Sequence, residues 1–136
     1  MKRRVSAGDY IPHRPPMAMV DDILLEKLPQ KAVSAVIRPG NRFLNGDGCL
    51  DRTCIPELVA QAAAAVNSYE NGGKCRQGML ALGRKIEFLS DIKVNDEITI
   101  TATDENPLDD WYVLTFAIHR KDGEICAQGE ISVCLF

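Results

Sequence analysis

The sequence predicts an α+β domain in which an antiparallel β-sheet wraps around one long central α-helix. The stretch at residues 47–73 is centred on the Ala-rich run Glu57–Asn67, which has the composition and the spacing of a helix. Most of the remaining chain has the alternating pattern of β-strands, with short turn signals between them. A mostly β chain with one hydrophobic helix is most simply built as two layers, with the sheet curled over the helix.

The predicted helix has two different sides. Apolar residues recur at helical spacing and share one face: Ile55, Leu58, Val59, Ala62, Ala63, Val66 and Tyr69. The opposite side carries Glu57, Gln61, Ala64 and Ser68. We predict Thr53 as the N-cap, which places Pro56 in the first turn, where its missing N–H does no harm. The Asn-Gly-Gly sequence at 71–73 ends the helix.

Strand patterns lie on both sides of the helix. Before it, one strand begins near Val20 and runs to Lys27, and an alternating strand at 31–38 pairs with it across Pro29-Gln30. After it, four strands are predicted at residues 79–89, 97–103, 111–120 and 124–135. Residues 106–110 are predicted to turn, and the Asp122-Gly123 pair is a strong hairpin signal between the last two strands. Short connections of this kind favour an antiparallel sheet.

Composition bounds the class of protein. The chain has 136 residues, 46% of them hydrophobic and 26% charged, which fits one globular domain spanning residues 1–136. No apolar run has the length of a membrane span, and the basic first four residues are not followed by the apolar core of an export signal, so we expect a cytoplasmic protein. A net charge of −3 argues against a nucleic-acid binder.

The five cysteines include no Cys-x-x-Cys pair, which argues against a disulfide framework and against a zinc site. We expect neither a metal nor a cofactor. Cys54 lies at the helix start, where a helix N-terminus can lower the pKa of a thiol and make it reactive. The alternative is that Cys54 is a small buried hydrophobic residue.

Three segments together resemble a known family. They are Ile11–Asp21 (IPHRPPMAMVD), Glu57–Ala63 (ELVAQAA) and Arg84–Glu97 (RKIEFLSDIKVNDE). In this order they are similar to the N-terminal segment, the start of the central helix and the following strand–turn–strand of the hotdog-fold 3-hydroxyacyl-[acyl-carrier-protein] dehydratases. The resemblance covers most of the chain. It implies a hotdog fold, a dimer with its site at the subunit interface, and a catalytic carboxylate at Glu57.

The chain departs from that family in the loop before the helix. The family carries a catalytic histidine there, whereas Asn45–Leu50 (NGDGCL) is shorter and contains none. Aligned through Phe43-Leu44, Asp47 stands at the position of the histidine. The two histidines of the chain are His13, which matches a non-catalytic histidine of the family, and His119, which lies in a late strand.

Dehydration of a 3-hydroxyacyl thioester needs a base that removes a proton from C2 and an acid that protonates the departing hydroxyl. Glu57, near the helix start, fits the acid; the alternative is a solvent-facing acid that interacts with the positive helix end. Gln61 lies one turn further along, where it either holds Glu57 by a hydrogen bond or only continues the polar side of the helix. Asp47 is the candidate base, provided that its surroundings raise its basicity; otherwise it is a turn residue. Gly48, Cys54 and Gln61 are candidate substrate-binding residues.

Two other functions use the same residues. Some hotdog thioesterases resemble this arrangement, with one carboxylate on the central helix, so Glu57 alone can serve that chemistry. A third reading is a catalytically degenerate subunit that binds an acyl carrier or pairs with an active dehydratase. The expected partners are therefore an acyl-carrier-protein or coenzyme A thioester and a second hotdog subunit, in a homodimer or a hetero-oligomer. Because carrier proteins are acidic, Arg84 and Lys85 are candidate docking residues.

Overall fold

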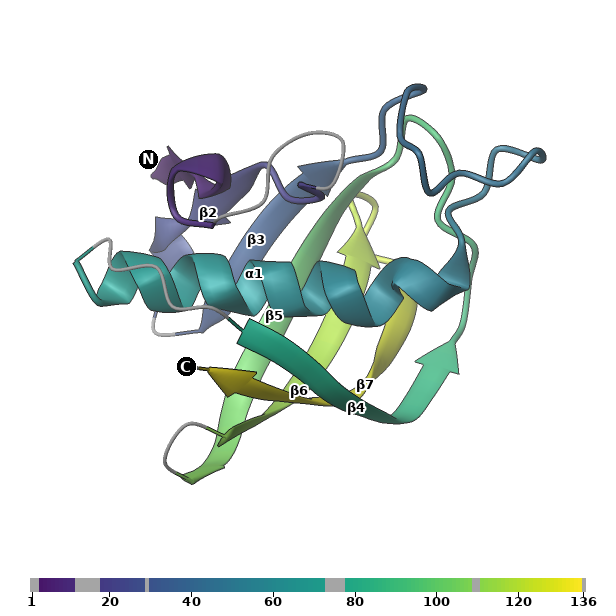
Figure 1. Ribbon diagram of the computed structural model, residues 1–136. Helices are drawn as coiled ribbons and strands as arrows, with labels where there is room; N and C mark the ends of the chain where they lie inside the picture. Colours follow the sequence, from purple (N-terminus) through teal and green to yellow (C-terminus); the bar gives the residue numbers. More distant parts are fainter. Residues whose placement is uncertain (1–2, 12–17, 29, 73–77, 109–110, 136) are drawn as a thin grey trace.

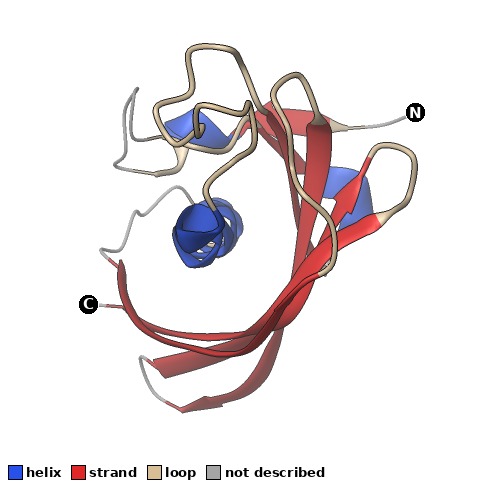
Figure 2. Cartoon of the chain, turned by 90° about the vertical axis from the view of Figure 1, so that its right-hand side faces the viewer, coloured by secondary structure: helices blue, strands red, loops and turns tan. Residues whose placement is uncertain are grey.

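The computed structural model describes residues 3–11, 18–28, 30–72, 78–108 and 111–135. Within these residues, one antiparallel sheet curves around the helix α1 (Ile55–Glu70), as Figures 1 and 2 show from two sides. The strands are β1 (Arg4–Ser6), β2 (Asp22–Leu24), β3 (Lys31–Val36), β4 (Gly78–Phe88), β5 (Glu97–Leu108), β6 (Trp111–Arg120) and β7 (Ile125–Leu135). The predicted α+β architecture is confirmed.

Helix α1 begins differently from the prediction. A 3₁₀ turn, Arg52–Cys54, precedes it, and this turn is capped by Asp51. Cys54 stands at the N-cap position of α1 and its side chain makes no capping bond, so the predicted cap at Thr53 is wrong. The Asp51 Oδ1 atom accepts bonds from the Thr53 N–H at 2.9 Å and from the Thr53 hydroxyl at 2.7 Å. These bonds favour the ionised carboxylate and lower the pKa of Asp51. Pro56 lies in the first turn and Asn71 caps the other end, both as predicted.

The helix is covered on more than its apolar face. The predicted apolar residues Leu58, Val59 and Val66 are fully buried, yet Gln61 and Ser68 on the predicted polar side are only 1% and 3% exposed. The N-terminal part of the chain covers that side at Gln61, because the Met19 N–H donates to the Gln61 Oε1 atom at 2.8 Å. It also meets the apolar face, where the Tyr10 and Tyr69 rings lie edge-on with 5.3 Å between their centroids. The helix is therefore a central element, and the polar side chains of Gln61 and Ser68 lie inside the domain.

The strands before the helix partly match the predicted ones. β2 and β3 pair as a hairpin, with Ile23 opposite Val33, as expected. The first predicted strand is shorter than expected, because a 3₁₀ turn (Leu25–Lys27) follows β2 directly. The strand β1, which pairs with β2, was not predicted, since three residues are too few to show an alternating pattern.

The strands after the helix form a sheet whose order differs from their sequence order. The full order is β1-β2-β3-β5-β6-β7-β4, so the chain crosses from β4 at one edge to β5 in the middle. β5 continues to Leu108, which corrects the predicted turn at 106–110. Its pairing with β6 shifts register after Glu105 and resumes at Leu108 opposite Trp111, so the strand runs through Pro107. The turn itself, 109–110, lies outside the described residues.

The edge strand β4 is bent by an irregularity opposite Gly129. Pairing of β4 with β7 shifts register between Arg84 and Glu87, and Lys85 adopts a φ of 52° there. The backbone of Ile86 passes so close to Gly129 that a Cβ atom on Gly129 would lie 2.8 Å from the Ile86 Cα atom. Only glycine permits this approach, which sets where the strand bends.

Candidate active site

Glu57 lies in the first turn of α1 and is half-buried. At this position the positive end of the helix dipole favours a negative charge. The Gln61 side chain, one turn along, donates a hydrogen bond from its Nε2 atom to the Glu57 Oε1 atom at 3.1 Å. The helical spacing seen in the sequence therefore brings these two side chains together.

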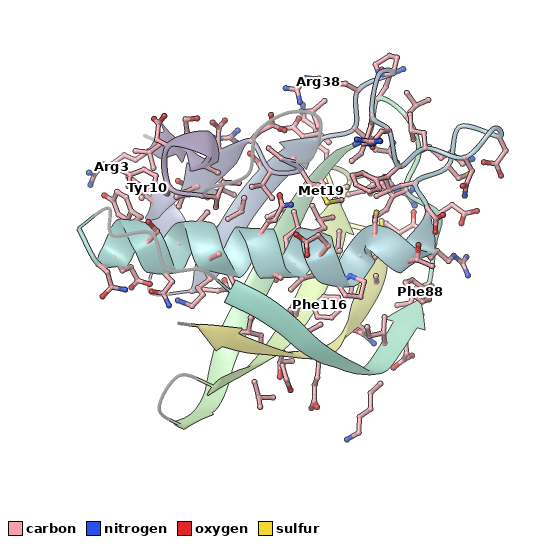
Figure 3. The ribbon with its side chains drawn as sticks, viewed as in Figure 1. Arg3, Tyr10, Met19, Arg38, Phe88 and Phe116 are labelled. Atoms are coloured by element: carbon pink, nitrogen blue, oxygen red, sulfur yellow. The ribbon has the colours of Figure 1, made fainter. Side chains whose placement is uncertain are left out.

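A main-chain group fixes the orientation of Gln61. The Met19 N–H donates to the Gln61 Oε1 atom at 2.8 Å in a buried environment, and Figure 3 shows Met19 beside the helix. With the amide oxygen engaged, the amide NH₂ is directed to Glu57. The Glu57 Oε1 atom thus accepts a hydrogen bond from an amide whose own orientation is fixed by the main chain.

The loop that carries Asp47 is closed by its own hydrogen bonds. Asn45 donates its N–H to the Cys49 carbonyl at 2.8 Å, and Gly48 donates to the Asn45 carbonyl at 3.0 Å. Gly48 has a φ of 83°, a left-handed conformation that favours glycine. Asp47 is exposed, and its Oδ1 atom accepts the Cys49 N–H at 3.0 Å. Its described contacts are thus those of a turn residue.

The same loop is fastened to the connection between β4 and β5. The Leu50 N–H donates to the Ile92 carbonyl at 2.7 Å, and the Val94 N–H donates to the Gly48 carbonyl at 2.9 Å. Cys49 forms an isolated bridge with Lys93 between them. The backbone of the loop therefore runs beside residues 92–94 immediately before it enters the helix.

Cys54 is buried, with 6% of its surface exposed. Burial, with a further contribution from the nearby Asp51 charge, raises the pKa of its thiol to about 12. The thiol is therefore neutral near pH 7, which favours the buried hydrophobic residue over the reactive thiol. Cys54 packs in the core beneath the helix start.

The candidate docking residues lie on β4. Lys85 is exposed and lines a hollow of about 410 Å³ on the outer face of the sheet, together with Thr101, Thr115 and Gln128. Their neighbours in the strands, such as Ile100 and Leu114, point to the helix and are buried. Lys85 thus lies on the opposite face of the sheet from Glu57.

The side chain of Arg84 and the whole of residues 12–17, including His13, lie outside the described part of the chain.

Within the described residues, no group of three or more His, Cys, Asp and Glu side chains is arranged to hold a metal ion. In the same part of the chain, no helix is long and apolar enough to cross a membrane.

A family model for ApeP dehydratase matches residues 5–135. The chain belongs to the ApeP-like dehydratase family. This confirms the dehydratase resemblance inferred from the three sequence segments. No match to the chain is found among curated proteins.

Solved structures share the fold of this ApeP-like chain. The dehydratase heterocomplex ApeI:P from Xenorhabdus doucetiae matches with a TM-score of 0.82 at 19% identity, covering 98% of this chain and 93% of the other. A Staphylococcus aureus protein solved in complex with CoA matches with a TM-score of 0.62 at 11% identity over 79% of this chain and 70% of its own. The PaaI protein of E. coli matches with a TM-score of 0.59 at 16% identity, covering 77% and 71%. These likenesses confirm the hotdog fold.

Proposed function

We propose that the chain is a 3-hydroxyacyl-thioester dehydratase subunit of acyl-chain biosynthesis, with Glu57 as the general acid. The observation that carries this proposal is the chain of hydrogen bonds from Met19 through Gln61 to Glu57 at the positive end of the central helix, in a member of a dehydratase family. The substrate is carried by acyl-carrier protein or by coenzyme A.

In the proposed reaction, a base takes the C2 proton and the C2–H electron pair forms the C2=C3 double bond. The C3–O bond breaks as Glu57 gives its carboxyl proton to the departing hydroxyl, so water leaves. Gln61 donates to Glu57 Oε1 and so holds the carboxyl group in one orientation at the start of the helix. The first turn of the helix favours the carboxylate that remains.

The base has two candidate sources. Asp47 of this chain is one, and its exposed position in a closed turn would have to change for its carboxylate to reach a substrate. A histidine from another hotdog subunit is the other. The missing histidine in residues 45–50 favours the second source, and the ApeI:P relative, which is a heterocomplex, supports it. In that case the chain works as part of a hetero-oligomer.

The test uses 3-hydroxyacyl and saturated acyl thioesters, each on carrier protein and on coenzyme A, with products followed by mass spectrometry. Loss of water from the 3-hydroxyacyl substrates is expected. Glu57→Gln should reduce that rate by about 10²–10⁴-fold while keeping the fold, because it removes the acidic proton but is nearly isosteric. Glu70→Gln, at the other end of the same helix, is the matched control and should keep full activity.

Four outcomes decide between these functions and between the two sources of the base. Release of free thiol from the saturated substrates would make the protein a thioesterase and overturn the dehydratase proposal. A Glu57→Gln variant with full activity would overturn the site. If Asp47→Asn is as slow as Glu57→Gln, Asp47 is the base. If activity appears only after addition of a histidine-containing hotdog partner, the partner supplies it.

A further inference from the structure

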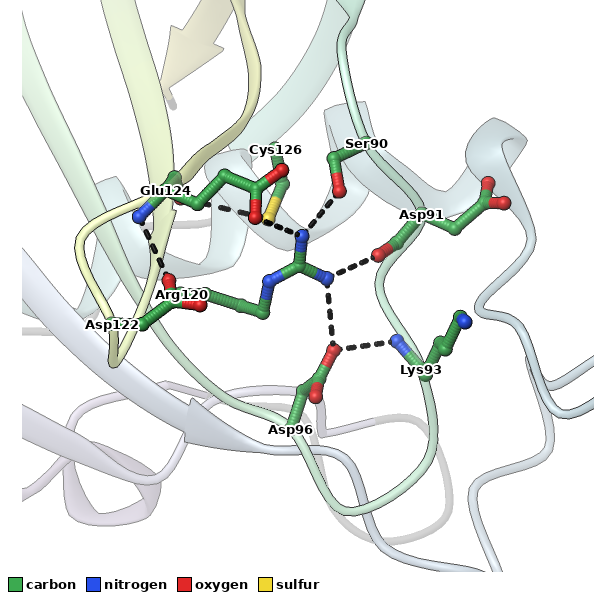
Figure 4. A network of polar contacts seen from close by, with 8 residues as sticks. All are labelled: Ser90, Asp91, Lys93, Asp96, Arg120, Asp122, Glu124 and Cys126. Atoms are coloured by element: carbon green, nitrogen blue, oxygen red, sulfur yellow. Dashed lines mark hydrogen bonds and ion pairs between the residues drawn. The ribbon is translucent and has the colours of Figure 1, made fainter.

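Arg120, at the end of β6, binds several groups at once (Figure 4). Its guanidinium donates to the Asp91 carbonyl at 2.6 Å and to the Ser90 hydroxyl, and lies 3.5 Å from Asp96 Oδ2. On the other side it pairs with Glu124 Oε2 at 3.0 Å. The arginine therefore fastens the connection between β4 and β5 to the hairpin between β6 and β7.

Asp91 is held from two directions. Arg120 holds its main-chain carbonyl, while the Arg52 guanidinium pairs with its Oδ1 atom at 3.2 Å. Arg52 belongs to the 3₁₀ turn from which α1 starts, and it also lies over the Phe88 ring, 5.3 Å from the ring centroid. Two arginines thus link the late β6–β7 hairpin, through one aspartate, to the start of the helix that carries Glu57.

The connection that Arg120 holds also supports the loop before the helix. The Ile92 carbonyl and the Val94 N–H bind that loop at Leu50 and Gly48. These contacts follow directly after Ser90 and Asp91 in the chain. A displacement of residues 90–91 would therefore move two segments that adjoin the start of α1: the loop at 48–50 and the 3₁₀ turn that carries Arg52.

An ordinary surface ion pair has none of these properties. The adjacent Lys121 pairs with Glu97 at 3.6 Å with a side chain that is 83% exposed, whereas the Arg120 side chain is 18% exposed. A planar guanidinium can bond several acceptors in fixed directions, while the lysine ammonium is a point charge on a flexible stem. Arg120 thus fixes the relative positions of the groups that it binds. Lys121 is a neighbouring cation that fixes no such positions, so it serves as the control.

We propose that Arg120 is a positioning residue that acts through the β4–β5 connection to hold the loop at 48–50 and the start of α1, and so sets the position of Glu57. The inference rests on the proposed function for its catalytic consequence. Its structural consequence, the coupling from Arg120 to the loop, is measurable without any substrate.

The first experiment measures amide hydrogen exchange by NMR in the wild type, in Arg120→Lys and in the control Lys121→Met. Arg120→Lys should speed exchange at Leu50 and Val94 by about tenfold, because the connection that supports these bonds is loosened. The Ala62 amide in the helix and the Ile100 amide in the central sheet should not change. The proposal is overturned if Leu50 and Val94 exchange as in the wild type, or if Lys121→Met has the same effect.

The second experiment measures kcat and KM at a temperature where every variant is folded. Arg120→Lys should lower kcat by about 10- to 100-fold with little change in KM, because Glu57 is misplaced while substrate binding remains. Unchanged kcat together with faster exchange would show that the coupling stops at the loop and would overturn the positioning role. A wild type without dehydratase activity would overturn the proposed function, and the exchange rates would still decide whether Arg120 holds the loop.

Discussion

Gln61 connects the N-terminal part of the chain to the proposed acid, so Gln61→Met tests the site and the fold together. Methionine has a similar length but cannot accept the Met19 N–H or donate to Glu57 Oε1, so both hydrogen bonds are lost. The position is 1% exposed and Met19 is 7% exposed, so water cannot easily replace the missing acceptor. The substitution therefore isolates the polar contacts from the packing volume.

The expected loss of stability follows from the burial of Gln61 and of the Met19 N–H. A buried N–H left without an acceptor costs about 1–3 kcal/mol, so we take about 2 kcal/mol for the Met19 N–H. For a chain of this size, 1 kcal/mol corresponds to roughly 4 °C, so Tm should fall by about 8 °C. Glu57 loses the hydrogen bond from Gln61 that helps to orient it, and we expect kcat to fall by about 10- to 100-fold, with a smaller change in KM.

Gln61→Glu provides a pH-dependent comparison. A protonated carboxyl can accept the Met19 N–H and share its proton with Glu57, so this variant should be close to wild type in acid. Burial and the neighbouring carboxylate raise the folded-state pKa of the new group above its unfolded value. The folded state then binds more protons than the unfolded state, so stability falls as pH rises above about 4.3, until the folded-state pKa is passed.

Thermal denaturation from pH 4 to pH 8 and steady-state kinetics measure both effects. The reasoning is refuted if Gln61→Met keeps the wild-type Tm and kcat, because then neither hydrogen bond matters. It is also refuted if the difference in Tm between Gln61→Glu and the wild type does not grow with pH.

Three further outcomes are expected. Val59→Asp should prevent folding, because Val59 is 0% exposed and an unpaired carboxylate buried there costs several kcal/mol. If circular dichroism showed that this variant is folded, the central position of the helix would be contradicted. The pKa of Cys54 is raised from 9.0 to about 12, so the thiol ionises first in the unfolded chain and the free energy of unfolding should fall as pH rises from 9 to 12. Urea titrations should show a weaker dependence of this free energy on pH in Cys54→Ala. The same pH dependence in both proteins would exclude a contribution from Cys54. The edge strand β4 should pair with a second subunit, so light scattering at micromolar concentration should show at least a dimer, and a monomer would exclude a composite site.

The sequence predicted the parts of the fold that depend on local pattern. The helix was recognisable because alanines and apolar residues at helical spacing identify it without knowledge of its neighbours. Strands β6 and β7 were placed within a residue of their observed ends because they alternate and flank an Asp-Gly turn. Capping by Asp51 was missed, since both Asp51 and Thr53 are good caps and only the geometry shows which one accepts the bonds.

Features that depend on distant pairing were not predictable. Nothing local in β4 shows that it crosses to β7, or that the polar side of the helix is covered by the N-terminal part of the chain. Within the candidate site, the contact of Gln61 with Glu57 followed from their spacing, but the contact of Gln61 with Met19 joins positions 42 residues apart. Arg120 carries no motif, and only the folded chain brings it to Asp91.

The crossing of β4 to the far edge of the sheet has a consequence for how the chain is made. β4 follows the helix in sequence, but its pairing partner is formed by residues 127–135, so a growing chain holds β4 without a partner until those residues leave the ribosome. The apolar side of the helix that β4 and β7 help to cover stays exposed for the same period. Pairings between such distant segments form slowly, and the waiting chain is open to aggregation. Early binding of a chaperone or of a subunit partner during synthesis should therefore raise the yield of folded protein more than added stability does.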